Sequence, residues 1–370
     1  MKLAIDLRTL YNSRISGIEK YTISLVNELI RQNHNEQFHL IGNSALLNEK
    51  PSSFIQESIT TSSKVEEANK VLALKGFLSN WDIYFSPYQP IPERRTYKGV
   101  ITVHDCIPLR YPDFFPKGTY THFDVYLRRS LNSIDHVIAD SHSTKKDVVD
   151  FYNVDESKIS VIHLAGMSDN LNKIILKKKD EVINKYGINS PYMLSVCTIE
   201  PRKNLIRTLK SFEIIRSRRK KKIKLVLVGS LGWGYSELMK LIHENDYKDD
   251  IILTGYVPEE DLPVLYKNAE LFLYPSLFEG FGLPVLEAMG YGTPVVTSNI
   301  SSLPEVGGGA VEYCDPYDTE SITHAIEEVI LSNGRQTELR QKGLERSKLF
   351  SWEKTARETR EVFMKVLNQN

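Results

Sequence analysis

Residues 274–306, YPSLFEGFGLPVLEAMGYGTPVVTSNISSLPEV, decide the fold of this chain. They predict a strand that ends near Tyr274, a glycine loop, and a helix opened by Pro284, because proline is tolerated in the first helical turn. Gly280 and Gly282 let the backbone approach an anion, and free amides at a helix start suit a phosphate. The stretch therefore predicts a diphosphate-binding loop without the Walker lysine pattern.

Two glutamates frame this loop, Glu279 just before it and Glu287 one turn inside the helix. A carboxylate accepts two hydrogen bonds at once and can hold vicinal hydroxyls, which both a sugar and a ribose offer. One interpretation is that each glutamate binds one end of a nucleotide sugar. The alternative is that Glu287 only complements the positive end of the helix.

Outside this stretch, short apolar runs alternate with amphipathic segments, as in parallel sheets covered by helices, so the fold class is α/β. The length of 370 residues suits two domains. We expect an N-terminal domain over 1–170, a charged linker over 171–190, a second domain over 191–345, and a final helix within 346–370 that folds back across the first domain. The expected strands cover residues 2–7, 38–42, 83–86, 100–103, 137–140, 160–163, 192–196, 223–228, 251–254, 271–274, 294–297 and 311–314.

Composition limits the partners and the compartment. Lys plus Arg equals Asp plus Glu at 47 each, so no global field favours nucleic acid. The basic run at 216–224 is either a solvated helix end or a contact with an anionic membrane surface. Three widely spaced cysteines, no leader pattern and no run of about 18 apolar residues predict a cytoplasmic protein, at most peripheral on a membrane.

A basic patch, Glu200-Pro201-Arg202-Lys203-Asn204, follows the first strand of the second domain. Cations at the carboxyl end of a strand, beside a helix start, neutralise a leaving diphosphate as its charge grows. Arg202 and Lys203 are therefore candidate catalytic residues. Alternatively, both are solvated surface cations.

The first domain offers His104, which follows the expected strand at 100–103, and the Ser16-Gly17 turn before a helix. A histidine at this strand end can hydrogen-bond a sugar, although a lone histidine is more often structural. Asp105 is expected to orient a loop or the imidazole. The aromatic candidates for sugar stacking, which are equally explained by packing, are Tyr11, Tyr84, Tyr88 and residues 111–115.

The E-x7-E pattern at 279–287, in the form F-E-G-F-G-L-P-x-L-E-A with G-T-P-V-V at 292–296, resembles the signature of glycosyltransferase family 4. The resemblance implies a retaining hexosyltransferase of the GT-B fold, with two Rossmann-like domains facing each other across a cleft. It implies that Glu279 contacts the donor sugar, that Glu287 binds the ribose and that His104 contacts the transferred sugar. It further implies these diphosphate contacts: Ser16, Gly17, Arg202, Lys203, Gly280, Phe281, Gly282 and Leu283.

The form T-I-E-P-R-K-N at 198–204 resembles a branch that contains bacterial mannosyltransferases of surface-polysaccharide and O-antigen assembly. The resemblance implies a nucleotide-sugar donor, GDP-mannose, and a saccharide or lipid-linked acceptor. Many family members carry an arginine about five residues before the lysine, where this chain has Cys197 and Thr198. Arg202 is expected to take over that phosphate contact.

No metal or cofactor is expected. The sequence has no D-x-D triplet, its histidines show no metal-ligand spacing, and no G-x-G-x-x-G fingerprint follows the first strand, which argues against a nicotinamide enzyme. Three alternatives stay open. They are a UDP-sugar transferase of the same family, a nucleotide-sugar 2-epimerase, which should show clustered carboxylates and histidines, and a non-catalytic nucleotide-sugar-binding subunit of an assembly complex.

Overall fold

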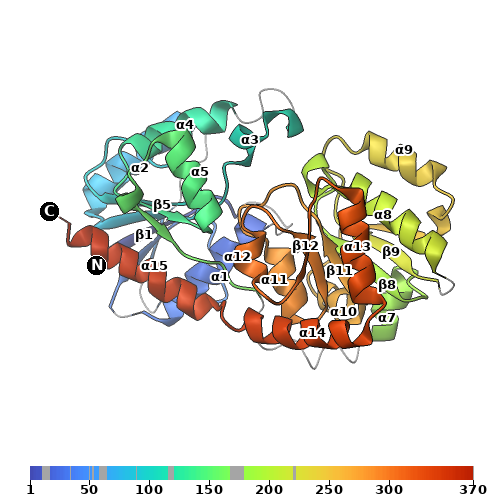
Figure 1. Cartoon of the computed structure of the whole chain (residues 1–370). Coiled ribbons are helices and arrows are strands. Elements are labelled where there is room, and N and C mark those ends of the chain that lie inside the picture. Colours follow the sequence, from blue (N-terminus) through green and yellow to red (C-terminus); the bar gives the residue numbers. More distant parts are fainter. Residues whose placement is uncertain are drawn as a thin grey trace. The chain divides into compact units, whose positions relative to one another are not determined.

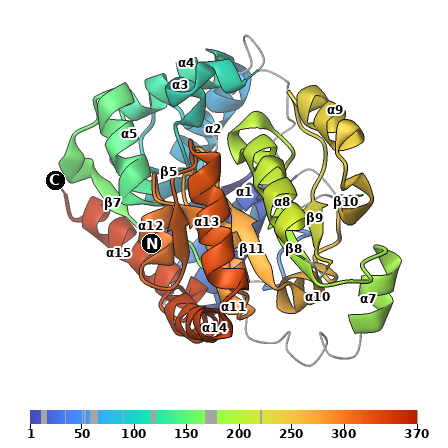
Figure 2. The same ribbon diagram turned by 45° about the vertical axis from the view of Figure 1, so that its right-hand side comes forward.

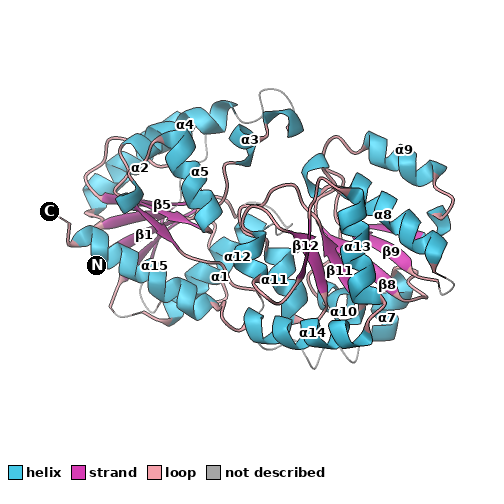
Figure 3. Cartoon of the chain, viewed as in Figure 1, coloured by secondary structure: helices cyan, strands magenta, loops and turns pink. Residues whose placement is uncertain are grey.

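The structure is a computed structural model that describes residues 1–10, 17–33, 35–49, 51, 54–57, 65–88, 90–115, 121–166, 179–219 and 222–369. The chain divides into two compact units. Unit 1 holds Met1–Pro112, Lys117–Ala165 and Phe350–Asn370, and unit 2 holds Asp113–Pro116 and Gly166–Leu349. Each unit is a sheet with helices on both of its faces (Figure 3).

Unit 1 is built on a seven-stranded parallel sheet in the order β3-β2-β1-β4-β5-β6-β7. The order reverses between β1 and β4, which is the doubly wound pattern that gathers functional groups at the carboxyl ends of the strands. The strands are β1 Lys2–Leu7, β2 Gln37–Gly42, β3 Phe54–Glu57, β4 Ile83–Ser86, β5 Lys98–Val103, β6 His136–Ala139 and β7 Ile159–Val161.

The helices of this part of the chain are α1 Gly17–Arg31, α2 Val65–Ser79, α3 Ile107–Arg110, α4 Thr121–Asn132, α5 His142–Tyr152 and α15 Trp352–Leu367, with 3-10 turns at Pro112–Phe114 and Glu156–Lys158. The last of them, α15, packs beside α1 although more than 300 residues separate them (Figure 1). The buried ring of Phe363 lies 5.3 Å from that of Phe85 on β4. Helices α2, α4 and α5 supply Leu72, Leu127 and Val148 to a different core cluster.

Unit 2 has a six-stranded parallel sheet in the order β10-β9-β8-β11-β12-β13. Its strands are β8 Tyr192–Val196, β9 Lys224–Val228, β10 Ile251–Gly255, β11 Leu271–Tyr274, β12 Val295–Ser298 and β13 Glu312–Cys314. Its helices are α7 Lys179–Lys185, α8 Leu205–Arg218, α9 Ser236–Glu244, α10 Leu262–Asn268, α11 Leu283–Gly290, α12 Leu303–Gly307, α13 Thr319–Ile330 and α14 Asn333–Ser347, with 3-10 turns at Pro201–Lys203 and Lys248–Asp250.

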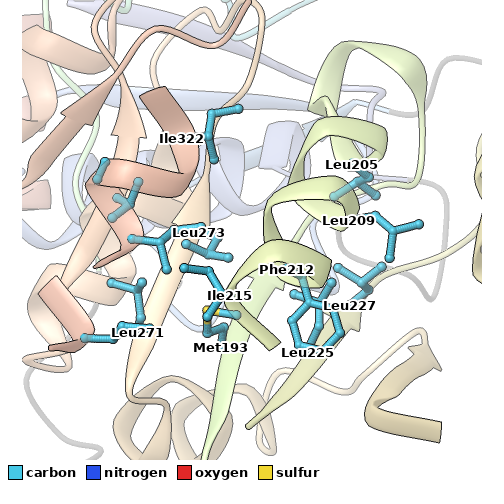
Figure 4. Close-up of a cluster of buried hydrophobic side chains, with 14 of the residues drawn as sticks. Met193, Leu205, Leu209, Phe212, Ile215, Leu225, Leu227, Leu271, Leu273 and Ile322 are labelled. Carbon is cyan, nitrogen blue, oxygen red and sulfur yellow. The ribbon is translucent and has the colours of Figure 1, made fainter. Parts of the chain in front are cut away.

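The core of unit 2 forms where α8 and α13, which lie side by side (Figure 2), cover one face of the sheet. From α8, Leu209 and Phe212 point at Leu225 and Leu227 of β9 (Figure 4). Each of these side chains is almost wholly buried. Burying a side chain of this size stabilises the fold by about 1.5–3 kcal/mol, so this apolar layer fixes the strand ends that carry the site.

All expected strands are present, with ends that differ by up to two residues. Strand β3, Phe54–Glu57, was not expected, because F-I-Q-E is short and half polar. The expected linker at 171–190 also includes a helix, α7. Within it α7 has a buried Val182, packs against α10, and pairs Lys185 Nζ with Asp261 Oδ2 over 2.7 Å, so this segment belongs to unit 2.

Candidate functional site

The glycine loop is held rigidly in front of α11. Gly282 has a φ of 111°, and a Cβ atom there would lie 2.8 Å from the Leu303 side chain, so the loop requires glycine at this position. The buried Ser302 hydroxyl donates to the carbonyls of Glu279 and Phe281 over 3.0 and 2.8 Å. These hydrogen bonds hold the backbone of the loop, and Leu283 begins the helix as expected.

Arg202 and Lys203 lie directly against Glu279. Lys203 Nζ donates to Glu279 Oε1 over 2.7 Å, and Arg202 Nη1 lies 2.8 Å from Glu279 Oε2. Arg202 also donates to the Phe278 carbonyl over 2.8 Å and to Glu200 Oε1 over 2.5 Å. Only 9% of Lys203 and 7% of Glu279 are exposed. Three of the predicted catalytic residues therefore form one buried charged cluster rather than a solvated surface patch.

The local backbone explains how this cluster forms. Lys203 ends a 3-10 turn after β8, and Asn204 follows in the left-handed conformation, with a φ of 59°. Asparagine tolerates that conformation better than most residues. Its side-chain amide donates to the carbonyls of Pro275 and Pro316 over 2.9 and 2.7 Å. The bond to Pro275 ties the turn to the loop that follows β11, which carries Glu279, and the bond to Pro316 ties it to the segment that follows β13.

The cluster sets the charge of Glu279. Burial alone would raise the pKa of this carboxyl, but the neighbouring Arg202 and Lys203 and a hydrogen bond from Ser276 hold it at about 2. Glu279 is therefore a carboxylate at any physiological pH. It can accept hydrogen bonds from a sugar and stabilise positive charge, but it does not serve as a proton donor.

Glu287 lies in α11, buried, with a different partner. The hydroxyl of Tyr266, from α10, donates to Glu287 Oε2 over 3.0 Å. A glutamate that merely complemented a helix end would lie in solvent at the first turn. Its burial and its tyrosine partner instead suit a carboxylate that is held in one orientation.

Cys197 and Thr198 stand about five residues before Lys203, where the family resemblance implied a further arginine. Burial raises the pKa of the Cys197 thiol to about 11, so the group is neutral at physiological pH and supplies no charge to an anion. Arg202, in the adjacent turn, has its guanidinium in the Glu279 cluster. The two cations of the cluster thus come from consecutive residues.

His104, in unit 1, stands at the carboxyl end of β5 with Asp140 as its partner. Its Nδ1 lies 2.6 Å from Asp140 Oδ2, and its ring meets the edge of Tyr21 at 4.8 Å. Burial lowers the pKa of the imidazole, but the Asp140 carboxylate outweighs burial and raises it. Asp105 was expected to orient a loop or the imidazole, and it orients the loop, because its Oδ1 accepts from the amide of Ile107 over 3.0 Å, whereas Asp140 holds the imidazole.

The remaining candidates of unit 1 divide into four groups. Gly17 is the first residue of α1, and no atom of the described residues lies within 4 Å of a Cβ atom placed there. Ser16 and Tyr11 lie outside the described residues. Tyr84 was wrong as a sugar-stacking surface, because it is fully buried and its hydroxyl donates to Asp6 over 2.7 Å. Tyr88 is partly buried, with its ring stacked 6.2 Å from that of His104.

The described part of the basic run pairs with acids of unit 2. Arg216 Nε lies 2.7 Å from Asp250 Oδ2, and Arg218 Nη1 lies 2.9 Å from Glu327 Oε1. These pairs favour the interpretation of the run as the charged end of α8.

Two further properties concern ions and membranes. Within the described ranges, no helix combines the length and the apolar character that a membrane span needs. Over the same residues, no three His, Cys, Asp or Glu side chains gather closely enough to hold a metal ion. The charged groups brought together beside the glycine loop are the cations Arg202 and Lys203 with the carboxylates Glu200 and Glu279.

Comparisons with known proteins agree with the architecture. Residues 178–346 match the family described as glycosyl transferases group 1, and residues 78–165 match glycosyltransferase family 4. The chain is 30% identical over 369 residues to the O-antigen chain mannosyltransferase B of Escherichia coli, covering 93% of this chain and 95% of that protein. It is 28% identical over 278 residues to a serotype-specific mannosyltransferase of Escherichia coli, covering 74% of this chain but 34% of that longer protein.

A glycosyltransferase from Rickettsia africae superposes with a TM-score of 0.76 over 100% of this chain and 99% of its own, at 16% identity. This likeness shows the fold, which is that of the GT-B glycosyltransferases, with two parallel-sheet α/β domains. The sequence matches go further than the fold. The chain belongs to glycosyltransferase family 4, and it is an enzyme of that class.

Proposed function

We propose that this glycosyltransferase moves mannose from GDP-mannose to a saccharide or lipid-linked acceptor of a surface polysaccharide, with retention of configuration and without a metal ion. The donor sugar and the type of acceptor are supported by the O-antigen chain mannosyltransferase to which the chain is 30% identical. The observation that carries the proposed chemistry is the buried cluster of Lys203, Arg202 and Glu279 beside the glycine loop.

In this proposal the acceptor oxygen attacks from the face that the diphosphate leaves. Lys203, Arg202 and the amides of residues 280–283 stabilise the leaving diphosphate, whose oxygen takes the acceptor proton. Glu279, kept ionised, orients the sugar and stabilises its oxocarbenium-like charge. Glu287 binds the ribose, and His104 donates a hydrogen bond to the sugar being transferred.

The donor assignment predicts which nucleotide stabilises the protein. In a thermal-shift screen against GDP, UDP and ADP and their sugars, we expect GDP and GDP-mannose to raise the melting temperature, and Glu287→Ala to abolish most of that rise. Glu312→Ala is the matched control, because its carboxylate pairs with Arg335 over 2.8 Å in the same unit, away from the loop. A selective response to UDP would show that the donor is a UDP-sugar and not GDP-mannose. A lack of response to every nucleotide at millimolar concentration would contradict the assignment of a donor site.

Metal independence is a separate prediction. Two protein cations beside the loop do the work that a divalent ion does at other diphosphate sites. We expect transfer rates to change by less than about twofold after treatment with a chelator, or on addition of Mg²⁺ or Mn²⁺. A tenfold loss of rate with the chelator, restored by one metal, would show that Lys203 and Arg202 do not suffice.

A further inference from the structure

A row of aromatic rings runs behind the glycine loop in unit 2. Tyr291 stacks on Tyr266 with ring centroids 5.5 Å apart, Tyr266 packs on Phe272 of β11 at 5.3 Å, and Phe272 stacks on Tyr274 at 5.8 Å. We call these four residues the aromatic row. Each ring is almost wholly buried. Their positions are therefore fixed by packing and do not depend on a ligand.

Two members of the row make hydrogen bonds through their hydroxyl groups to residues at the two ends of the candidate donor site. Tyr266 donates to Glu287 Oε2 over 3.0 Å. The Tyr274 hydroxyl accepts from Lys203 Nζ over 2.7 Å, and the same ammonium group lies 5.0 Å from the Tyr274 ring centroid. Lys203 in turn donates to Glu279. Both glutamates of the E-x7-E pattern are thus connected to one rigid row, at points eight residues apart in the sequence.

We propose that Tyr266 and Tyr274 are positioning residues for donor binding and for departure of the diphosphate, respectively. This inference rests on the proposed function and assigns roles to residues that touch no donor atom themselves. Tyr266 keeps the Glu287 carboxylate at one angle, so that the carboxylate meets a ribose without first losing rotamer freedom. Tyr274 keeps the Lys203 ammonium group against Glu279, close to where negative charge develops on the leaving diphosphate.

The hydroxyls, rather than the rings, carry the proposed roles. Glutamate and lysine side chains each lose rotamer entropy when fixed, and a group fixed in advance does not lose it again on binding. Burial, followed by the nearby carboxylate of Glu287, holds the pKa of the Tyr266 hydroxyl well above its usual range, and the same holds for Tyr274 beside Glu279. Both hydroxyls therefore remain protonated at physiological pH.

The experiment compares Tyr266→Phe and Tyr274→Phe with Tyr192→Phe in the full-length protein. Tyr192, on β8, is a matched control because its buried hydroxyl donates to the Leu265 carbonyl over 2.6 Å in the same unit. All three changes remove one buried hydrogen bond and keep the ring. Folding is checked by melting temperature, and affinity for GDP, UDP and ADP is measured by calorimetry.

For Tyr266→Phe, the dissociation constant of the nucleotide that the wild type binds should rise about tenfold, with kcat changed less than about threefold. The 3′-deoxy form of that nucleotide should distinguish a positioning role of Tyr266 from a loss of stability. Wild type should bind it more weakly than the parent nucleotide, whereas the variant should bind both within about twofold, because the ribose contact is already impaired. A loss of stability alone would not produce that convergence.

For Tyr274→Phe, kcat should fall at least about tenfold while the donor KM changes less than about threefold. Tyr192→Phe should lower the melting temperature without either kinetic effect. If the wild type binds a nucleotide and both active-site variants behave like Tyr192→Phe, the positioning roles are wrong and the proposed function stands. If the wild type binds no nucleotide, the positioning roles and the proposed function are both wrong.

Discussion

Replacing Lys203 by alanine is expected to lower kcat by about 10²–10³-fold, the usual effect of removing one preorganised group from a site where negative charge develops. The change removes the ammonium group that lies 2.7 Å from both Glu279 Oε1 and the Tyr274 hydroxyl. Glu279 would keep Arg202 as its cation. The initial rate of nucleoside diphosphate release, measured with donor and acceptor saturating, tests this expectation.

Lys185→Ala is the control for this change. Lys185 makes an ion pair of the same length with Asp261 in the same unit, but half of its side chain is exposed. The Lys185 ammonium group is open to solvent, and the buried Asp261 carboxylate keeps the Tyr186 hydroxyl as a partner, so we expect rate and stability close to wild type. A folded Lys203→Ala enzyme that retained more than about a fifth of the wild-type kcat would contradict the electrostatic role of Lys203.

The largest effect on stability is expected for Phe363→Ala in α15, at about 3–5 kcal/mol in unit 1, because a fully buried ring would leave a cavity against Phe85. Urea unfolding should be followed by tryptophan fluorescence in a Trp233→Phe background. The two tryptophans that then remain, Trp81 and Trp352, both lie in unit 1.

Met364→Ala is the control for Phe363→Ala, because the next side chain along α15 is 47% exposed. We expect a change within about 0.5 kcal/mol for this control, as for most surface substitutions. If the unfolding midpoint of unit 1 were the same for both variants, α15 would not be part of its core. Because the chain has two compact units, we expect two unfolding transitions, and that of unit 1 is to be fitted separately.

Much of the fold was predictable because parallel strands buried on both faces read as continuous apolar runs, as in residues 225–228 and 271–274. The glycine loop was also predictable, because the requirement for glycine at Gly282 comes from the local backbone conformation. The pairing of Lys203 with Glu279 was not predictable from the spacing alone, since 76 residues separate them. The motif predicted a role for each residue, but not their contact with each other.

Asp140 was missed although a signal existed. The strands at 100–103 and 137–140 were both expected, and in the sheet β5 and β6 are neighbours with Val103 opposite Ala139. The next residue of each strand is then His104 and Asp140, which meet. The order of strands in the sheet, which the sequence did not provide, was the missing step. Tyr266 offered no comparable signal, because its place beside Glu287 depends on how α10 packs on α11.

The division of the chain has a consequence for synthesis on the ribosome. Apart from residues 113–116, unit 2 is one continuous segment inserted into unit 1, whose own core contains α15. Domains generally fold as units while the chain emerges. Unit 2 can therefore complete its folding once residue 349 has left the exit tunnel, whereas the half that begins first must wait for residues 352–367. Until then, the apolar surface around Phe85 stays uncovered. We therefore expect a chaperone to bind the nascent N-terminal part of unit 1 and not unit 2.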